Sequence, residues 1–139
     1  MNLALWAVQI LQASLYGWAG FEKAFHYGHV VEMWHWPARV PQALVTFIGI
    51  AEMLGAIGLI LPWLTGIQRW LTPLAAAALV TLMTLASIAH ILWGEAPHVA
   101  FTGTMLALNL FITLGRRAAL GSGFSKKESA SLLPTRRGR

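Results

Sequence analysis

Glu52 is the residue whose chemistry is most unusual for its place in this sequence. It lies in the middle of an apolar run, Leu44 to Leu61, that Pro41 and Pro62 bracket. About twenty helical residues at 1.5 Å each match the roughly 30 Å hydrocarbon core of a bilayer. A charged side chain near the midplane costs on the order of 3 kcal/mol or more. We therefore predict that this run spans a membrane and that Glu52 faces other helices of a bundle, which the small residues of the run allow to approach closely.

Three other polar residues are predicted to lie at the depth of Glu52. Counting helical rise inward from the outer ends of the predicted spans places Gln12, Thr84 and Asn109 about 15 Å deep, one on each remaining span. In such a layer Gln12 and Asn109 can donate hydrogen bonds to the Glu52 carboxyl group. We expect Lys23, about ten residues higher, to extend toward the interface rather than pair with Glu52. Without a cation at this depth, burial favours the neutral carboxyl group.

This polar layer has two interpretations. As a structural feature it fixes the register of the bundle through interhelical hydrogen bonds, at about 1 kcal/mol per contact. As a functional feature it binds a polar head group or a proton-coupled ligand such as a quinone, because ionisable groups inside membranes are often functional. The residues do not decide between the two.

A second polar group is predicted nearer the outer surface. His26 and His29 have i, i+3 spacing and could share a metal ion on one helix face, and His90 could ligate haem. Histidines among tryptophans at an interface usually act as amphipathic anchors, so we predict no metal ligand. Neither a Gly-x-Ser-x-Gly elbow nor a nucleotide-binding glycine motif occurs. The members of this group are Tyr16, Glu22, Lys23, His26, His29, His90, Glu95 and His98.

These residues are positioned by an all-α architecture of four transmembrane helices. A connector, Glu22 to Val40, carries tryptophans and histidines of the kind that settle at head groups, and we expect a short interfacial helix there. The tail from Arg116 has no apolar periodicity and is expected to be largely disordered. We thus predict a four-helix transmembrane domain over residues 1–115 and a basic tail over 116–139. The predicted spans are Leu3 to Phe21, Leu44 to Leu61, Leu71 to Trp93 and Val99 to Leu114.

Composition supports a small integral membrane protein. The 139 residues are 57% hydrophobic and 11% charged, and cysteine is absent, which excludes disulfides and thiolate chemistry in this chain. The net charge of +5 could suggest nucleic acid, but seven of the ten Lys and Arg residues follow Leu114. We interpret this bias as a topology signal and expect no nucleic-acid partner. With four spans it places both termini in the cytoplasm and the protein in the inner (plasma) membrane.

The order of these segments resembles the DoxX-like family of small four-helix membrane proteins. The matching stretches are GFEK at Gly20 to Lys23, FIGIAEMLGAIGLILP at Phe47 to Pro62, LTPLAAAALVTLMTLASIAH at Leu71 to His90, and GE at Gly94 and Glu95. The resemblance implies a four-helix bundle, named for a subunit of a thiosulfate:quinone oxidoreductase and often linked with redox complexes. By matching position, Lys23, Glu52, His90 and Glu95 are the family-like polar residues.

Two functional hypotheses follow. The first is a membrane subunit of a quinone-linked redox complex, not catalytic alone, that binds a quinone or another lipophilic molecule near Glu52 and His90. The second is a non-catalytic accessory subunit that holds a larger membrane complex together. A small proton-coupled carrier is a weaker third option, because four spans leave little room for a pathway and no inverted repeat is evident. The predicted ligand-binding residues are Gln12, Lys23, Glu52, His90, Glu95 and Asn109, and the predicted partners are the bilayer and other membrane subunits or further copies of the chain.

Overall fold

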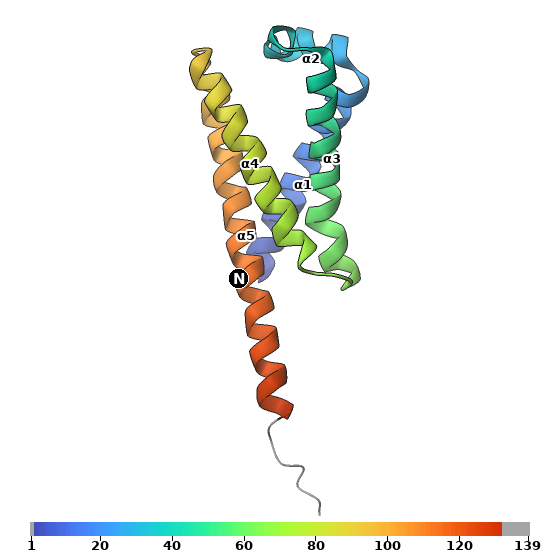
Figure 1. Cartoon of the computed structure of the whole chain (residues 1–139), viewed down its shortest axis with the longest axis vertical. Helices are drawn as coiled ribbons and strands as arrows, with labels where there is room; N and C mark the ends of the chain where they lie inside the picture. Colours follow the sequence, from blue (N-terminus) through green and yellow to red (C-terminus); the bar gives the residue numbers. More distant parts are fainter. Residues whose placement is uncertain (1, 132–139) are drawn as a thin grey trace, which may run out of the picture.

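The chain is entirely helical over the residues that the structure describes. The computed structural model describes residues 2–131, which contain five α-helices and one 3-10 helix and no strand. Four α-helices are long and one is short (Figure 1). In chain order the elements are α1 (Asn2–Phe25), α2 (Tyr27–Trp34), η1 (Trp36–Arg39), α3 (Gln42–Thr65), α4 (Leu71–Leu92) and α5 (Ala96–Ser131).

Three of the helices are long and apolar enough to cross a membrane. Among the described residues these are α3, α4 and the part of α5 over Ala96–Gly123. Helix α1 has 24 residues, which is sufficient length, but it is not among them. Its apolar stretch is interrupted by Gln9 and Gln12 and ends at Glu22 and Lys23. The structure therefore supports three of the four predicted spans, while α1 meets the requirement for length only.

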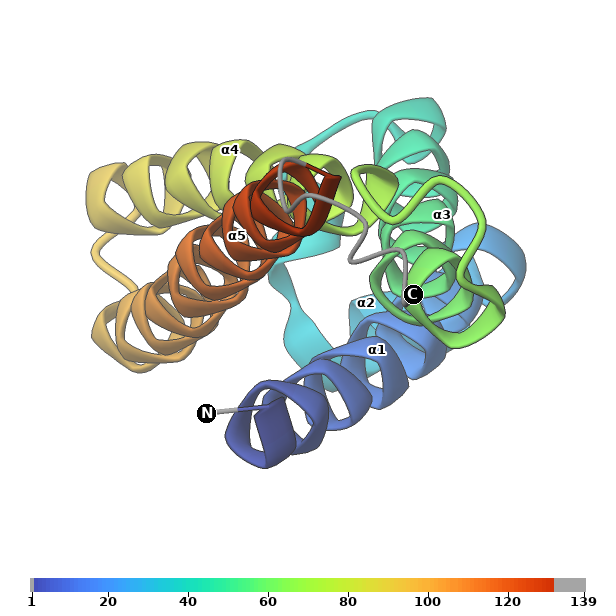
Figure 2. The ribbon, with the colours of Figure 1, turned by 90° about the horizontal axis from the view of Figure 1, so that it is seen from below.

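The long helices associate as two pairs. Helix α1 packs against α3, and α4 packs against α5; α3 also contacts α4, and α1 contacts α5. The two pairs are closest near the α3–α4 turn and separate toward the end that carries α2 (Figure 1). Viewed along the bundle, the four long helices surround one central region (Figure 2). Near the α3–α4 end the core fills this region, with Tyr16, Ala56, Leu59, Ala76, Leu79, Met83, Met105 and Ile112.

Two glycines set the distance between α1 and α3. A Cβ atom built on Gly20 would lie 2.6 Å from the Gly49 carbonyl oxygen, and one on Gly49 would lie 2.6 Å from the Gly20 carbonyl oxygen. Both separations are far below van der Waals contact, so only glycine allows the backbones to come this close. This contact lies one helical turn from Glu52 and beside Lys23, and it brings those two side chains within reach of each other.

The connector and the tail differ in how far they follow the sequence predictions. The predicted short helix in the connector is present as α2, and it is followed by the 3-10 turn η1, which begins next to Pro37. Helix α5 does not stop at Leu114 but continues to Ser131, so residues 116–131 are helical where we expected disorder. The α-helical backbone bonds continue through the described part of this segment because no proline occurs in it. Residues 132–139 of the predicted tail lie outside the described residues.

Candidate ligand-binding site

A cavity of about 730 Å³ lies between the two helix pairs at the end where they separate. All four long helices, α2 and η1 contribute to its lining, which is dominated by aliphatic side chains and four tryptophans. Trp18, Trp34, Trp36 and Trp93 come from α1, from the connector and from the residue that follows α4. The polar side chains that reach the cavity are Tyr16, Lys23, Glu52, His90, His98 and Thr102. A mostly apolar wall with a few convergent polar groups is typical of small-molecule sites, and this volume lies within their usual range.

Lys23 and Glu52 form a buried ion pair at the cavity wall. The Lys23 amine lies 2.6 Å from Glu52 Oε2 and 2.9 Å from Oε1, and the two side chains are only 8% and 4% exposed. This contradicts our expectation that Lys23 extends away from Glu52 and that no cation reaches its depth. The close contact at Gly20 and Gly49 explains the difference, because it brings the α1 backbone near enough for a lysine side chain to reach inward along α3. Lys23 thus supplies the charge that compensates the buried carboxylate.

The predicted midplane layer is divided. Asn109 donates to the Tyr16 hydroxyl over 2.6 Å and accepts a longer hydrogen bond from Gln12 at 3.5 Å, and all three side chains are buried. Gln12 also donates to the Met105 carbonyl oxygen. Contrary to expectation, neither Gln12 nor Asn109 forms a hydrogen bond with Glu52. Thr84 is exposed, and its hydroxyl group donates a hydrogen bond to the Val80 carbonyl oxygen of its own helix. Gln12 and Asn109 do lie side by side, as two members of one layer should, but depth along a helix does not specify the direction in which a side chain points.

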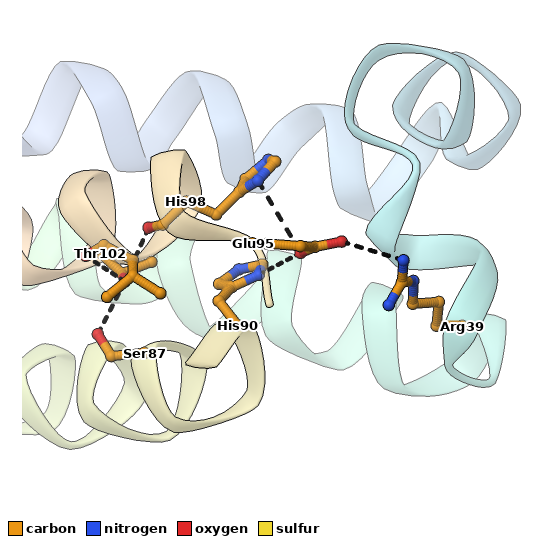
Figure 3. Close-up of polar contacts among 7 residues, drawn as sticks. Arg39, Ser87, His90, Glu95, His98 and Thr102 are labelled. Atoms are coloured by element: carbon orange, nitrogen blue, oxygen red, sulfur yellow. Dashed lines mark hydrogen bonds and ion pairs between the residues drawn. The ribbon is translucent and has the colours of Figure 1, made fainter. Parts of the chain in front are cut away.

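A second polar cluster joins the end of α4 to the start of α5. His90 Nδ1 lies 2.7 Å from Glu95 Oε2, and His98 Nδ1 lies 3.9 Å from the same oxygen (Figure 3). The other oxygen of Glu95 lies 3.5 Å from Arg39 Nη2, which comes from η1. Hydrogen bonding to His90, with the nearby charge of Arg39, holds the pKa of the Glu95 carboxyl below its usual range. Glu95 therefore connects the connector to both helices of the second pair.

His90 is fixed among aromatic rings. The ring of His98 stacks on it with centroids 4.9 Å apart and planes 19° apart, whereas Trp36 and Trp93 meet it edge-on at 5.9 Å and 5.7 Å. Only 5% of His90 is exposed. On the next turns inward, the Ser87 hydroxyl donates to Thr102 over 2.7 Å and holds α4 to α5 beside the cluster (Figure 3). His90 thus reaches the cavity as a rigidly held imidazole.

A family model of the DoxX-like family matches residues 7–112. The chain belongs to the DoxX-like family. It is a membrane protein, in agreement with its three span-length apolar helices. Neither the curated proteins nor the solved structures compared with it include a match.

The DoxX-like region contains all six residues that the sequence predicted for ligand binding, but the structure separates them. Lys23, Glu52 and His90 line the cavity. Glu95 lies beside it in a smaller surface hollow with His90, while Gln12 and Asn109 lie in the packed interior and do not line it. The tryptophans and His98 are lining residues that we did not predict as ligand contacts. For all of these except Trp18, which lies in α1, the clustering in the connector and around the α4–α5 turn was the available signal.

A buried charged side chain, Arg116, lies beyond the matched DoxX-like region. The Arg116 side chain is fully buried, with its Nε donating to Gln9 Oε1 and its guanidinium 4.1 Å from the centre of the Trp63 ring. Gln9 in turn donates to the Leu59 carbonyl oxygen. We had assigned Arg116 to the tail, because its neighbours in sequence are basic. It instead joins α5 to α1 and α3, at the end of the bundle opposite the cavity.

Proposed function

We propose that this protein is a membrane subunit that binds a lipophilic molecule with a polar head group, of the quinone class, in the cavity between the helix pairs. The observation that supports the proposal best is the cavity itself, whose wall is mostly apolar and aromatic and includes the polar side chains of Lys23, Glu52 and His90 among the few that reach it. A quinone carbonyl oxygen accepts hydrogen bonds, and the lysine amine and an imidazole N–H are donors. An isoprenoid tail would lie along Leu44, Phe47 and Phe101, which line the same cavity.

The chain itself contains no evident redox group, so its role in a redox reaction would be to hold the lipophilic molecule for a partner subunit. Cysteine is absent from the sequence, which leaves no thiolate for electron transfer. We therefore propose a quinone-linked complex in which another subunit supplies the electrons. The bound head group would exchange protons with Lys23, Glu52 or His90.

The proposed topology has four spans, with α1 crossing the membrane as a partner of α3. Helix α1 is held against α3 along its length, and its two glutamines bond within the bundle rather than facing lipid. The start of α1 lies at the same end of the bundle as the α3–α4 turn, which carries Arg69 (Figure 1). The positive-inside rule then favours a cytoplasmic location for this end and for the basic C-terminal segment, in the inner (plasma) membrane. The transmembrane domain would cover residues 1–115.

The experiment is purification of the full chain from its native membrane in mild detergent, followed by mass spectrometry of every lipophilic molecule and protein that remains bound. We expect a quinone at close to one molecule per chain. Ala86→Phe, which places a ring in the cavity, should abolish its retention, and Ala78→Phe on an exposed face of the same helix should not. A wild-type protein that carries no lipophilic molecule, or equal retention in both variants, would refute the proposal. Stable partner subunits without a ligand would support the accessory-subunit alternative instead.

A further inference from the structure

Three side chains with metal-binding donor atoms converge where α4 meets α5. His90, Glu95 and His98 each offer one donor atom, and these atoms all lie within 4.8 Å of one another. They belong to the last turn of α4, the connecting turn and the first turn of α5, so the fold itself brings them together. We propose that these residues form a binding site for a divalent first-row transition metal ion such as Zn²⁺, with two imidazoles and one carboxylate as ligands.

The donor set specifies the class of metal ion. Imidazole nitrogens suit Zn²⁺, Cu²⁺, Fe²⁺ and Ni²⁺, whereas Mg²⁺ and Ca²⁺ prefer sites built from oxygen atoms. Two histidines and one carboxylate leave coordination positions open, as in metal sites that also bind a second molecule. His90 and His98 both line the large cavity. The open positions of a bound ion are therefore accessible from that cavity.

The surroundings of the cluster resemble those of established metal sites. Arg39 holds Oε1 of Glu95 at 3.5 Å and leaves Oε2, the atom that both histidines face, as the metal ligand. Trp36 and Trp93 meet the His90 ring edge-on and fix its orientation. Hydrogen-bonded carboxylates and an apolar surround are features that orient metal ligands and exclude water.

Metal binding requires one local rearrangement. The rings of His90 and His98 are stacked with planes 19° apart, so their nitrogens do not point at one common position. The buried His90 is held by its aromatic neighbours, but the His98 side chain is 34% exposed and lies in the first turn of α5. His98 is therefore the ligand that turns, and binding removes the stacking contact between the rings.

The chain contains a matched control on its own surface. Glu22 contacts His29 at 2.7 Å and His26 at 3.4 Å, so it has the same two imidazoles and one carboxylate. Both of these histidine side chains are more than half exposed, at 51% and 57%, and the set does not bring its donors together as closely as the His90 cluster does. A non-specific response to metal would appear at this site as well as at the proposed one.

The test is titration of the full chain in detergent with Co²⁺, followed by its visible absorption, and with Zn²⁺, followed by calorimetry. We expect one ion per chain and no response to Mg²⁺. His98→Ala and Glu95→Gln should weaken metal binding by on the order of 100-fold. Removing a residue that only hydrogen-bonds to a metal ligand already lowers metal affinity about 10- to 100-fold. His29→Ala should leave binding unchanged. The His98→Ala variant changes a partly exposed side chain, so the test remains valid even if a substitution at the buried His90 prevents folding.

The proposal fails if wild-type protein binds no Co²⁺ or Zn²⁺, or if His98→Ala binds as tightly as wild type. It also fails if His29→Ala removes the bound ion. This inference does not depend on the proposed function, because the titration uses metal alone. A wild-type protein that binds no metal ion but retains a lipophilic molecule would refute the metal site only, and a wild-type protein that binds the ion but retains no lipophilic molecule would refute the lipophilic ligand only.

Discussion

Both carboxylate oxygens of Glu52 accept hydrogen bonds from the amine of Lys23, at 2.6 Å and 2.9 Å, in a part of the bundle where both side chains are buried. The Lys23 amine also lies 5.0 Å from the centre of the Trp34 ring. This ion pair links α1 to α3 and faces the cavity at the same time. Its energetic contribution and its availability to a ligand can be tested separately.

Removing one partner of this ion pair should destabilise the protein more than removing both. Lys23→Met leaves a buried carboxylate and Glu52→Gln leaves a buried ammonium group, so each single variant should lose about 3–5 kcal/mol of unfolding free energy. The double variant should recover most of that loss. A double-mutant cycle measured by unfolding in detergent gives the coupling energy, with Glu22→Gln as an exposed-pair control. Additive losses would show that the two residues do not interact energetically.

The contact between α1 and α3 should not tolerate a methyl group. In Gly49→Ala the added carbon would lie 2.6 Å from the Gly20 carbonyl oxygen and 2.7 Å from the Ala24 nitrogen, both of which are backbone atoms. The helices must then separate, and we expect a loss of about 1–3 kcal/mol in stability. Gly103→Ala is the control, because no atom lies within 4 Å of its new carbon. In detergent, Gly49→Ala should therefore have a lower thermal unfolding midpoint than Gly103→Ala.

The interior hydrogen bonds of Asn109 should contribute more to the stability of the fold than the hydrogen bond of Thr84, although the two residues were predicted to lie at the same depth. Asn109→Leu removes the donor to the Tyr16 hydroxyl and the acceptor for Gln12, and leaves both of these buried polar groups with fewer partners. We expect a loss of about 1–3 kcal/mol in stability. Thr84→Val changes only an exposed hydroxyl group and should shift stability by less than about 0.5 kcal/mol. Similar losses in the two variants would restore the single-layer interpretation.

The surface pair of Glu22 and His29 should contribute a pH-dependent part of stability. The hydrogen bond to His29 holds the pKa of the Glu22 carboxyl below its usual value of 4.5. A lowered pKa in the folded state stabilises the fold above the usual value, and this stabilisation is lost as the pH falls through the folded-state pKa. The difference in unfolding midpoint between wild type and His29→Ala should therefore diminish below pH 4.5.

The matching control for this pH dependence is Gln42→Ala, which changes an exposed and uncharged side chain. Its difference from wild type should be the same at every pH. A difference for His29→Ala that stays constant or grows toward acidic pH would contradict the role assigned to Glu22.

The sequence by itself determined the helical class, the membrane environment and the positions of the apolar helices. These properties depend on local features, namely the length of an apolar run and the prolines and glycines at its ends. Each of these features can be recognised within a single stretch of sequence, without knowledge of the other helices. The same is true of the connector, where crowded tryptophans and histidines predicted the short helix that is present as α2. The helical continuation of α5 was missed because low apolar periodicity does not prevent a long helix from extending beyond its packed part.

Only the tertiary structure decided which polar side chains meet. The partner of Glu52 is Lys23 rather than Gln12 or Asn109, because the approach of α1 to α3 at Gly20 and Gly49 depends on both helices together. The shared contact of His90 and His98 with Glu95 depends in the same way on the angle at which α5 leaves the turn. Rotation about a helix axis and distance between axes are set by packing, and they are not encoded in the depth of a residue along its own helix.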